Sequence, residues 1–253
     1  MNEPAGLQWI GGLPVIVPDW PAPACIRAYA TTRRGGFSGG DHDSLNLSTR
    51  VGDDPKAVAA NCAHLAQTLA LPQAPRWLHQ VHGAHVVDAA APVDSEADGR
   101  YSLQAGAICA VQTADCLPVL LCDEHGEAVA ALHAGWRGLA AGILEAGVQR
   151  LPVPPSRLLV WLGPAIASAA FEVGMEVRDA FLTVDPGAQV CFRAGRESRW
   201  QADLYGLARR RLRQAGVERI YGGHYCTHTQ SDWFYSYRRQ TVCGRMASLI
   251  WLD

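Results

Sequence analysis

Residues 117–133 read LPVLLCDEHGEAVAALH, and the arrangement of the chain follows from how this segment turns back on itself. Two apolar runs flank the polar stretch 123–126, a pattern that is typical of a β-hairpin with a four-residue loop. In the register that this loop sets, Cys116 lies directly opposite His133, with the two Cβ atoms roughly 5 Å apart. A thiol and an imidazole at that distance can share a metal ion or form a thiolate–imidazole pair.

Further elements follow on either side of the hairpin. A strand over 77–83 is expected to pair with 86–88, and a surface loop is expected over 91–106. Because hairpins outnumber strand–helix–strand units, we predict an α+β fold: a single layered domain over 1–253, with mixed, largely antiparallel sheets flanked by helices. The other expected strands are 108–113, 158–162, 219–221 and 247–252, and the expected helices are 55–70, 138–150, 172–182 and 203–215.

Composition narrows the class of protein. The chain has 253 residues, of which 49% are hydrophobic and 18% charged, and its formal net charge is -2. This charge lacks the basic excess of a general nucleic-acid binder. There is no 18-residue uncharged apolar run, and the first residues do not resemble a secretory signal. We therefore expect a cytoplasmic protein that binds neither nucleic acid nor membrane. We also predict a monomer or weak dimer.

The eight cysteines do not form a disulfide framework in this interpretation. They include no C-x-x-C pair, and the chain is long enough to build a core without covalent links. Cys62, Cys109 and Cys122 stand in apolar runs and are expected to be inert thiols. Cys116 differs from them because a histidine is expected beside it, although an inert buried thiol remains an alternative there.

His82 is the expected third member of the site. It follows a predicted strand and precedes Gly83, where the backbone can turn tightly. His79 stands three residues earlier and would point to the opposite face of a strand. Zinc accepts thiolate and imidazole ligands, and three protein ligands leave one position for water or substrate. The residues alone leave open whether these side chains bind a metal or are ordinary structural residues.

The segments around these residues also carry a family signature. The chain resembles the bacterial YfiH-type proteins, which are described both as laccase-domain or multicopper polyphenol oxidases and as purine nucleoside phosphorylases. The resemblance extends over nearly the whole chain. Its motifs are Thr31-Thr32-Arg33, Ser44-Leu45-Asn46-Leu47, Val51-Gly52-Asp53-Asp54-Pro55, Gln80-Val81-His82-Gly83, Gln112-Thr113-Ala114-Asp115-Cys116-Leu117-Pro118, His133-Ala134-Gly135-Trp136-Arg137-Gly138, Tyr235-Ser236-Tyr237-Arg238-Arg239 and Gly244-Arg245-Met246-Ala247.

The resemblance implies a fold similar to the catalytic domain of a cysteine-dependent deamidating toxin. It implies a zinc ion bound by His82, Cys116 and His133. It also implies phosphorolysis of adenosine, inosine and methylthioadenosine, with adenosine deamination as a second activity. Two departures from the family pattern, Ala170-Phe171 before Glu172 and Gln240 after the paired arginines, would alter the cavity wall and not the metal ligands.

Roles for the remaining residues follow from residue type and motif position. Cys116, His133 and Arg137 are predicted to be catalytic. Arg137, together with Arg33 and Arg238, is a candidate to hold phosphate, because a guanidinium matches phosphate oxygens bidentately. Asn46 is predicted to bind ribose or base through its amide.

Three other functions compete with this interpretation. A copper-dependent polyphenol oxidase would use Cu²⁺, but such chemistry needs several copper ions, and only two of the nine histidines fall in the cluster. A cysteine amidohydrolase that edits peptidoglycan precursors would use Cys116 as nucleophile and His133 as its base. A non-catalytic metal-binding or docking protein is the third alternative, and no charge run or amphipathic repeat supports it.

Overall fold

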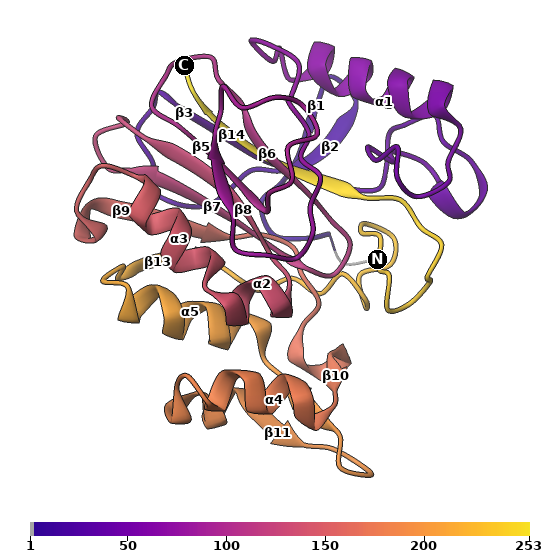
Figure 1. Cartoon of the computed structure of the whole chain (residues 1–253). Helices are drawn as coiled ribbons and strands as arrows, with labels where there is room; N and C mark the ends of the chain where they lie inside the picture. Colours follow the sequence, from indigo (N-terminus) through magenta and orange to yellow (C-terminus); the bar gives the residue numbers. More distant parts are fainter. Residues whose placement is uncertain (1–2) are drawn as a thin grey trace.

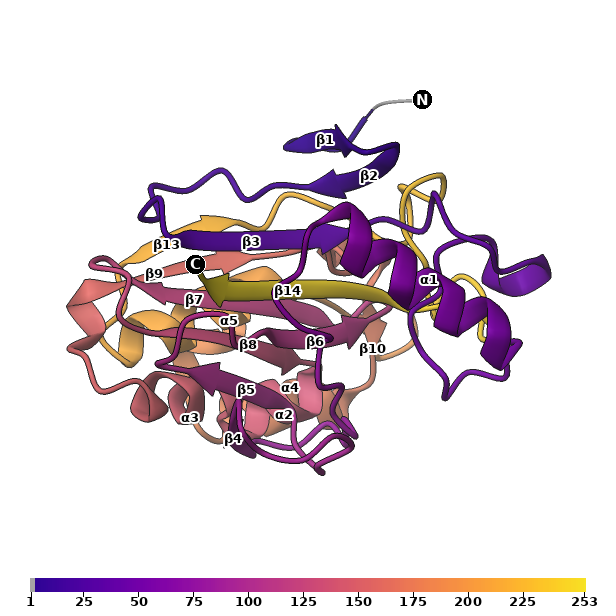
Figure 2. The same cartoon turned by 90° about the horizontal axis from the view of Figure 1, so that it is seen from above.

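Two β-sheets stacked face to face form the centre of the molecule, with helices on both outer sides (Figure 1). The computed structural model describes residues 3–253. The five-stranded sheet is antiparallel throughout, and Figure 2 shows its strands β3 and β14 side by side. Its order is β1 (Leu7–Ile10), β2 (Leu13–Ile16), β3 (Ile26–Thr31), β14 (Met246–Leu252) and β6 (Cys109–Thr113).

The six-stranded sheet is parallel only where β13 pairs with β9 and β4 pairs with β5. Three helices cover its outer face, and α1 covers the outer face of the other sheet. The sheet order is β13 (Arg219–Gly222), β9 (Leu158–Leu162), β7 (Leu117–Asp123), β8 (Val129–Ala134), β5 (Gly99–Ser102) and β4 (Val86–Asp88). The helices are α1 (Pro55–Thr68), α2 (Trp136–Ala141), α3 (Ile143–Arg150) and α5 (Leu204–Gln214).

Alternation along β7 explains why the layers form. All seven of its residues are buried. Successive side chains point to opposite faces of the strand, and both faces of this sheet are covered. Val119 and Leu121 pack with the helices, whereas Leu120 and Cys122 pack against the five-stranded sheet. The predicted α+β fold with mixed, largely antiparallel sheets is confirmed.

None of the helices in residues 3–253 combines the length and apolar character needed to cross a membrane.

The hairpin differs from its predicted register. The Asp123 N–H donates to the Ala128 carbonyl at 2.9 Å, so the loop begins one residue later than expected, and Pro118 faces His133. The prediction that Cys116 lies directly opposite His133 is therefore wrong by two residues. A shift of two positions keeps every side chain on its expected face, because the strand repeat is two residues.

Three other elements differ from expectation. Residues 77–83 are not a strand, and their one β-bridge joins His79 to Glu96. The parallel partner of β4 is instead β5, which lies inside the segment 91–106 that was expected to be a loop. The predicted helix 138–150 is divided by Gly142, which has a φ of 98°. Such a φ is costly for any residue but glycine, so the helix axis breaks there.

A small lobe extends from the layered body, at the bottom of Figure 1. It contains the predicted helix 172–182, which begins only at Met175 because residues 172–173 form a strand instead. The lobe consists of α4 (Met175–Leu182) and a three-stranded sheet in the order β10 (Glu172–Val173), β12 (Trp200–Ala202) and β11 (Phe192–Ala194).

Candidate metal centre and active-site cavity

Three side chains that are distant in sequence converge at one end of the stacked sheets. The ligand atoms of His82, Cys116 and His133 all lie within 4.8 Å of one another. His133 comes from β8, Cys116 follows β6 and precedes β7, and His82 comes from the loop before β4. The two imidazole rings meet edge to face, with their centroids 4.8 Å apart. The predicted grouping of these three residues is thus present in the structure.

Asp98 positions both His82 and His133 through hydrogen bonds on the side away from the cluster. Its fully buried carboxylate accepts hydrogen bonds from the backbone amides of Val81, His82 and Gly83 at 2.6–3.2 Å. The same carboxylate lies 2.7 Å from Nδ1 of His133. This contact leaves Nε2 of His133 for the cluster, which is the arrangement that carboxylates impose on metal-binding histidines.

The backbone at His82 is shaped by this carboxylate. His82 has a φ of 62°, a left-handed conformation that a residue with a side chain rarely adopts. The three successive amides around Asp98 form a small anion-binding turn, and their hydrogen bonds offset the local strain. A second link comes from Gln80 and Gln112, which exchange hydrogen bonds of 2.7 and 2.8 Å and join the His82 loop to β6.

Cys116 is positioned by the residue before it. Asp115 has a φ of 86°, and its carboxylate accepts from the Thr227 hydroxyl at 2.6 Å and from the Arg238 amide at 2.7 Å. The Asp115 carbonyl accepts from the Ile166 amide. These bonds connect the turn that carries the thiol to the chain segments that follow β9 and β13.

The electrostatics of the cluster favour a thiolate. Burial raises the pKa of Cys116, but the positive charge of His133 and hydrogen bonds from His133 and His82 outweigh this and lower it below the usual thiol value. Burial lowers the pKa of His133, and the nearby thiolate and the Asp98 carboxylate raise it overall. The fully buried thiol of Cys109 shows the opposite behaviour, because burial without such partners raises its pKa. A deprotonated thiolate is the form that binds metals.

The donor set fits a zinc ion. Zinc takes sulfur at about 2.3 Å and nitrogen at about 2.0–2.1 Å, so tetrahedral ligand atoms lie roughly 3.5 Å apart. The ligand atoms of the three residues lie within 4.8 Å of one another, so small side-chain rotations would bring them to these separations. Gly135 gives the cluster its room, since a Cβ there would lie 2.9 Å from the Cys116 sulfur and 3.0 Å from Cδ2 of His82.

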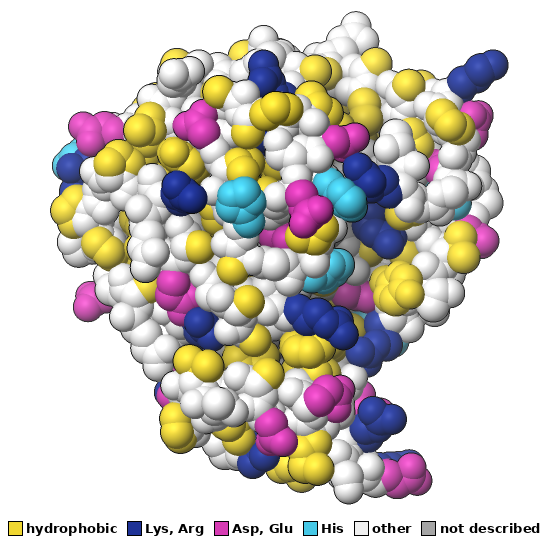
Figure 3. All heavy atoms as spheres, viewed as in Figure 1, with side chains coloured by type: hydrophobic (Ala, Val, Ile, Leu, Met, Phe, Trp, Pro, Cys, Tyr) yellow, Lys and Arg dark blue, Asp and Glu magenta, His cyan; other side chains and the backbone are white. Residues whose placement is uncertain are grey.

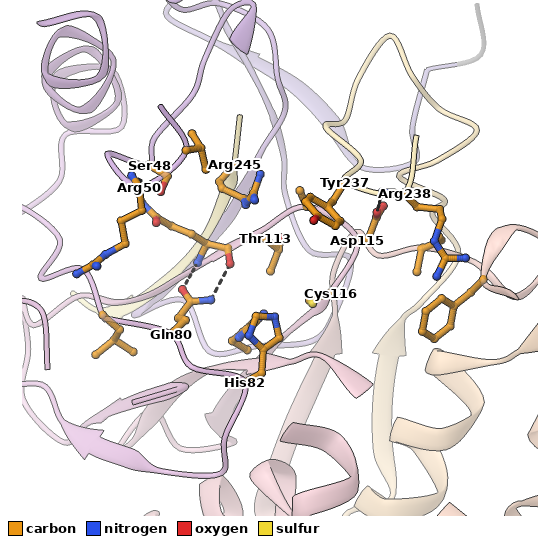
Figure 4. Close-up of a pocket in the computed structure, with 17 residues that line it drawn as sticks. Ser48, Arg50, Gln80, His82, Thr113, Asp115, Cys116, Tyr237, Arg238 and Arg245 are labelled. Atoms are coloured by element: carbon orange, nitrogen blue, oxygen red, sulfur yellow. Dashed lines mark hydrogen bonds between the residues drawn. The ribbon is translucent and has the colours of Figure 1, made fainter. Parts of the chain in front are cut away.

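A cavity of about 480 Å³ opens over the cluster. Figure 4 shows Cys116 and His82 at its floor, with Arg245 and Arg50 on one side and Tyr237 and Arg238 on the other. On the face drawn in Figure 3, Arg or Lys and His side chains gather around a hollow near the middle of the molecule. This volume is in the range of small-molecule sites, and the lining combines cationic, aromatic and amide groups.

The cavity does not contain every residue that was predicted for it. Arg33 donates to the carbonyls of Asp43 and Ser231 and lies over the Tyr235 ring, outside the lining. Asn46 is fully buried and hydrogen-bonded within the protein. Arg137 is exposed and lies over the ring of its neighbour Trp136. Arg238, in contrast, lines the cavity.

Several lining residues were missed by the reasoning from sequence. They include Arg50, Arg245, Gln80 and Tyr237, which stand in or beside the quoted motifs. Their motif positions were the available signal, but nothing in the linear spacing shows that the loop after β3 and the start of β14 reach the same cavity.

Comparison with known proteins establishes the family. The chain belongs to the family described as multi-copper polyphenol oxidoreductase laccase, which matches residues 27–253. The predicted family resemblance is confirmed.

Individual relatives are similar over almost their whole length. The chain is 52% identical over 239 residues to purine nucleoside phosphorylase PA4543 of Pseudomonas aeruginosa, covering 94% of this chain and 98% of the relative. It is 49% identical over 240 residues to purine nucleoside phosphorylase YfiH of Escherichia coli K12, with the same coverage. The crystal structure of protein NMB0706 from Neisseria meningitidis superposes with a TM-score of 0.92 at 48% identity, covering 94% of this chain and 99% of that one.

Proposed function

We propose that this chain is a zinc-dependent purine nucleoside phosphorylase that cleaves adenosine, inosine and methylthioadenosine with phosphate, and that it deaminates adenosine as a second activity. The observation that carries the proposal is the cluster of His82, Cys116 and His133 at the floor of a cavity with cationic and aromatic walls. The names of two relatives that share about half of the sequence support the same reaction.

His82, Cys116 and His133 would hold the zinc ion. When bound, zinc would supply a Lewis acid that polarises a substrate oxygen or lowers the pKa of a coordinated water. Asp98 keeps the proton of His133 at Nδ1, so that Nε2 faces the cluster. A copper oxidase would need several metal sites, and residues 3–253 contain one such histidine–cysteine cluster.

For phosphorolysis the cavity must bind phosphate and the nucleoside together, with a phosphate oxygen in line with the bond from C1′ to the purine. A phosphate oxygen forms a bond to C1′ of the ribose while the bond from C1′ to the purine nitrogen breaks, and the base takes the electron pair and a proton. Guanidinium groups in the cavity wall neutralise the phosphate charge. The rings of Phe171 and Tyr237 offer faces on which a purine can stack.

Product analysis tests this proposal directly. Zinc-loaded protein is incubated with adenosine, inosine or methylthioadenosine, with and without phosphate, and the products are identified by chromatography and mass spectrometry. We expect free base together with ribose 1-phosphate, or methylthioribose 1-phosphate from the third substrate, only when phosphate is present. Inosine formed from adenosine without phosphate would report the deaminase activity.

Two controls make the outcome decisive. The Cys116→Ser variant, which replaces the thiolate by a hydroxyl of similar size, should lose zinc and turnover together, whereas Cys25→Ser removes a thiol outside the cavity and should keep both. Release of base at the same rate with and without phosphate would contradict phosphorolysis. Full turnover in metal-free protein would contradict zinc dependence.

A further inference from the structure

We propose that Arg245 is the principal phosphate-binding residue of this cavity, and that Asn46 is a positioning residue that fixes Arg245. The inference rests on the proposed phosphorylase function and assigns its anion subsite, which the sequence had attributed to Arg33, Arg137 and Arg238.

The cavity carries an excess of positive charge. Arg50, Arg238 and Arg245 line it, and Asp115 is the carboxylate in the lining. Both oxygens of Asp115 already accept hydrogen bonds, from the Thr227 hydroxyl and the Arg238 amide. Arg50 is paired with Asp94, but among residues 3–253 Arg238 and Arg245 have no carboxylate partner, so the site favours an anion such as phosphate.

The three arginines differ in how far they are already engaged. Arg50 is exposed and ion-paired with Asp94 at 3.0 Å. Arg238 is exposed, donates to the Glu172 carbonyl and lies over the Phe171 ring. Arg245 lies over the Tyr237 ring, with its Cζ 5.9 Å from the ring centroid, and it is half-buried, so its charge is less screened by water.

The guanidinium of Arg245 uses one nitrogen to hold itself to the backbone and has two others that can donate to a ligand. Its Nη1 donates to the carbonyls of Cys243 and Gly244 at 2.8 and 3.0 Å. Among residues 3–253, no hydrogen-bond partner of its Nε and Nη2 atoms is found. One side of the guanidinium is thus fixed to the backbone, and the other side is available for the two oxygens of a bidentate phosphate.

The backbone beneath the guanidinium is held firmly. The Arg245 amide donates to Oδ1 of Asn46 at 2.9 Å, and Nδ2 of Asn46 is fixed by the Ser48 carbonyl and by Asp53. Gly244 packs closely here, since a Cβ would lie 2.5 Å from the Tyr235 ring and 2.9 Å from Cβ of Asn46. The buried amide of Asn46 therefore fixes the backbone at Arg245 and lies outside the cavity lining.

The strand register brings Arg245 to the metal centre. Met246 on β14 pairs with Thr113 on β6, so Arg245 lies beside the turn that leads to Cys116. In Figure 4 the Arg245 side chain enters the cavity above Thr113 and the cluster. Phosphate held there would lie between the guanidinium and the cluster, and the part of the cavity toward Phe171 is left for the purine.

Steady-state kinetics of zinc-loaded variants test the assignment. Arg245→Gln should raise the KM for phosphate about 10- to 100-fold, the loss expected for a charge-assisted bidentate contact, while the KM for inosine changes little. Arg245→Lys should fall between, because it keeps the charge and loses the fork. Arg150→Gln removes an exposed charge at the end of α3 and serves as the matched control with unchanged values.

The failure of the subsite and that of the proposed function are distinguishable. A phosphorolytic wild type with an unchanged phosphate KM in Arg245→Gln would overturn the subsite alone. If the wild type releases no free base, the phosphorylase proposal fails, and phosphate binding measured by calorimetry on the wild type and Arg245→Gln still decides the anion site.

A measurement on the wild type needs no variant to fold. An arginine-specific dicarbonyl reagent is applied with and without inorganic phosphate, and the modified peptides are quantified by mass spectrometry. We expect phosphate to protect Arg245 more than Arg50 and to leave Arg150 unprotected. Equal modification of Arg245 with and without phosphate would contradict the proposal.

Discussion

Asp98 shows how a single carboxylate organises the candidate metal centre. It accepts four hydrogen bonds, three from the turn that carries His82 and one from Nδ1 of His133. Burial raises the pKa of Asp98, but the hydrogen bond and charge of His133 and the bonds from the amides lower it below the usual carboxyl value. The residue therefore orients two ligands at once without belonging to the cluster.

The Asp98→Asn substitution should weaken zinc binding by about 10- to 100-fold. An amide has one acceptor oxygen in place of two, so at least one of the amides at 81–83 or the His133 ring loses its partner. Zinc affinity is measured by competition with a chromophoric chelator. The exposed Asp19→Asn change is the charge-matched control, and equal affinities for both variants would show that Asp98 does not position the ligands.

The convergence of His82, Cys116 and His133 could be predicted from sequence, because the hairpin brings two of them together and the motif supplies the third. The roles of Arg33 and Asn46 could not. Each stands in a motif, but whether a polar side chain points into a cavity or into the protein depends on contacts far along the chain. Asn46 is bonded to Arg245, almost two hundred residues away.

Helix α2 packs very close to the turn that carries His82. A Cβ on Gly138 would lie 2.6 Å from the Gly83 carbonyl, and one on Gly135 would contact the side chains of both Cys116 and His82. Glycine at these two positions lets the first turn of the helix lie against the candidate metal centre.

The Gly135→Ala substitution should therefore reduce zinc affinity and turnover while leaving the fold intact. The backbone at Gly135 has a φ of −64°, which alanine adopts readily, so the effect comes from crowding of the ligands. Zinc titration and circular dichroism measure the two effects. Gly39→Ala, where an added Cβ would meet nothing within 4 Å, should bind zinc normally, and normal binding by Gly135→Ala would refute the crowding.

The last residue of β7 adds a pH-dependent contribution to stability. Asp123 is fully buried and accepts two hydrogen bonds from Arg157, at 2.9 and 2.7 Å. Burial raises its pKa, but the Arg157 guanidinium, together with backbone hydrogen bonds, holds the pKa below its ordinary value of 3.8. A lowered folded-state pKa stabilises the protein above the unfolded value, and this contribution disappears as the pH falls through the folded value.

Asp123→Asn should accordingly lower the free energy of unfolding at neutral pH, and its deficit relative to the wild type should shrink below about pH 4. Urea unfolding between pH 7 and pH 3 provides the measurement. Asp179→Asn disrupts an exposed pair with Arg178 and should show little deficit at any pH. A deficit in Asp123→Asn that is constant across this range would exclude the ion pair as its cause.

Most strands and helices could be predicted from periodicity, but the segment 91–106 could not. It contains β5, in which Gly99 and Arg100 are buried although neither residue type favours a buried strand. Arg100 is buried because its Nη1 and Nη2 atoms donate to four backbone carbonyls between residues 88 and 92. Tertiary hydrogen bonding of this kind leaves no periodic trace in the sequence.

A zinc ion held in the candidate metal centre should contribute to the stability of the folded protein as well as to turnover. Its ligands come from the six-stranded sheet, from the link between the two sheets and from the loop before β4. A ligand that binds only the folded state stabilises it, so zinc at about 100 times its Kd should raise the melting temperature by roughly 5–10 °C.

Differential scanning calorimetry with zinc and with a chelator measures this rise. The Cys116→Ser variant should lose the zinc-dependent increase, whereas Cys25→Ser should retain it because Cys25 lies outside the cluster. The same increase in both variants would mean that zinc stabilises the protein from another position.

Consecutive strands β6 and β7 belong to different sheets, and Cys116 lies on the short crossing between them. Sliding one layer against the other by a single residue step, about 3.3 Å, would draw the sulfur away from His133. The distance between the Cys116 sulfur and the His133 imidazole therefore depends on how the two sheets are aligned. Enlarging a side chain such as Val111 or Ala131, which are buried between the sheets and outside the cavity lining, should disturb catalysis at temperatures where the protein is still folded.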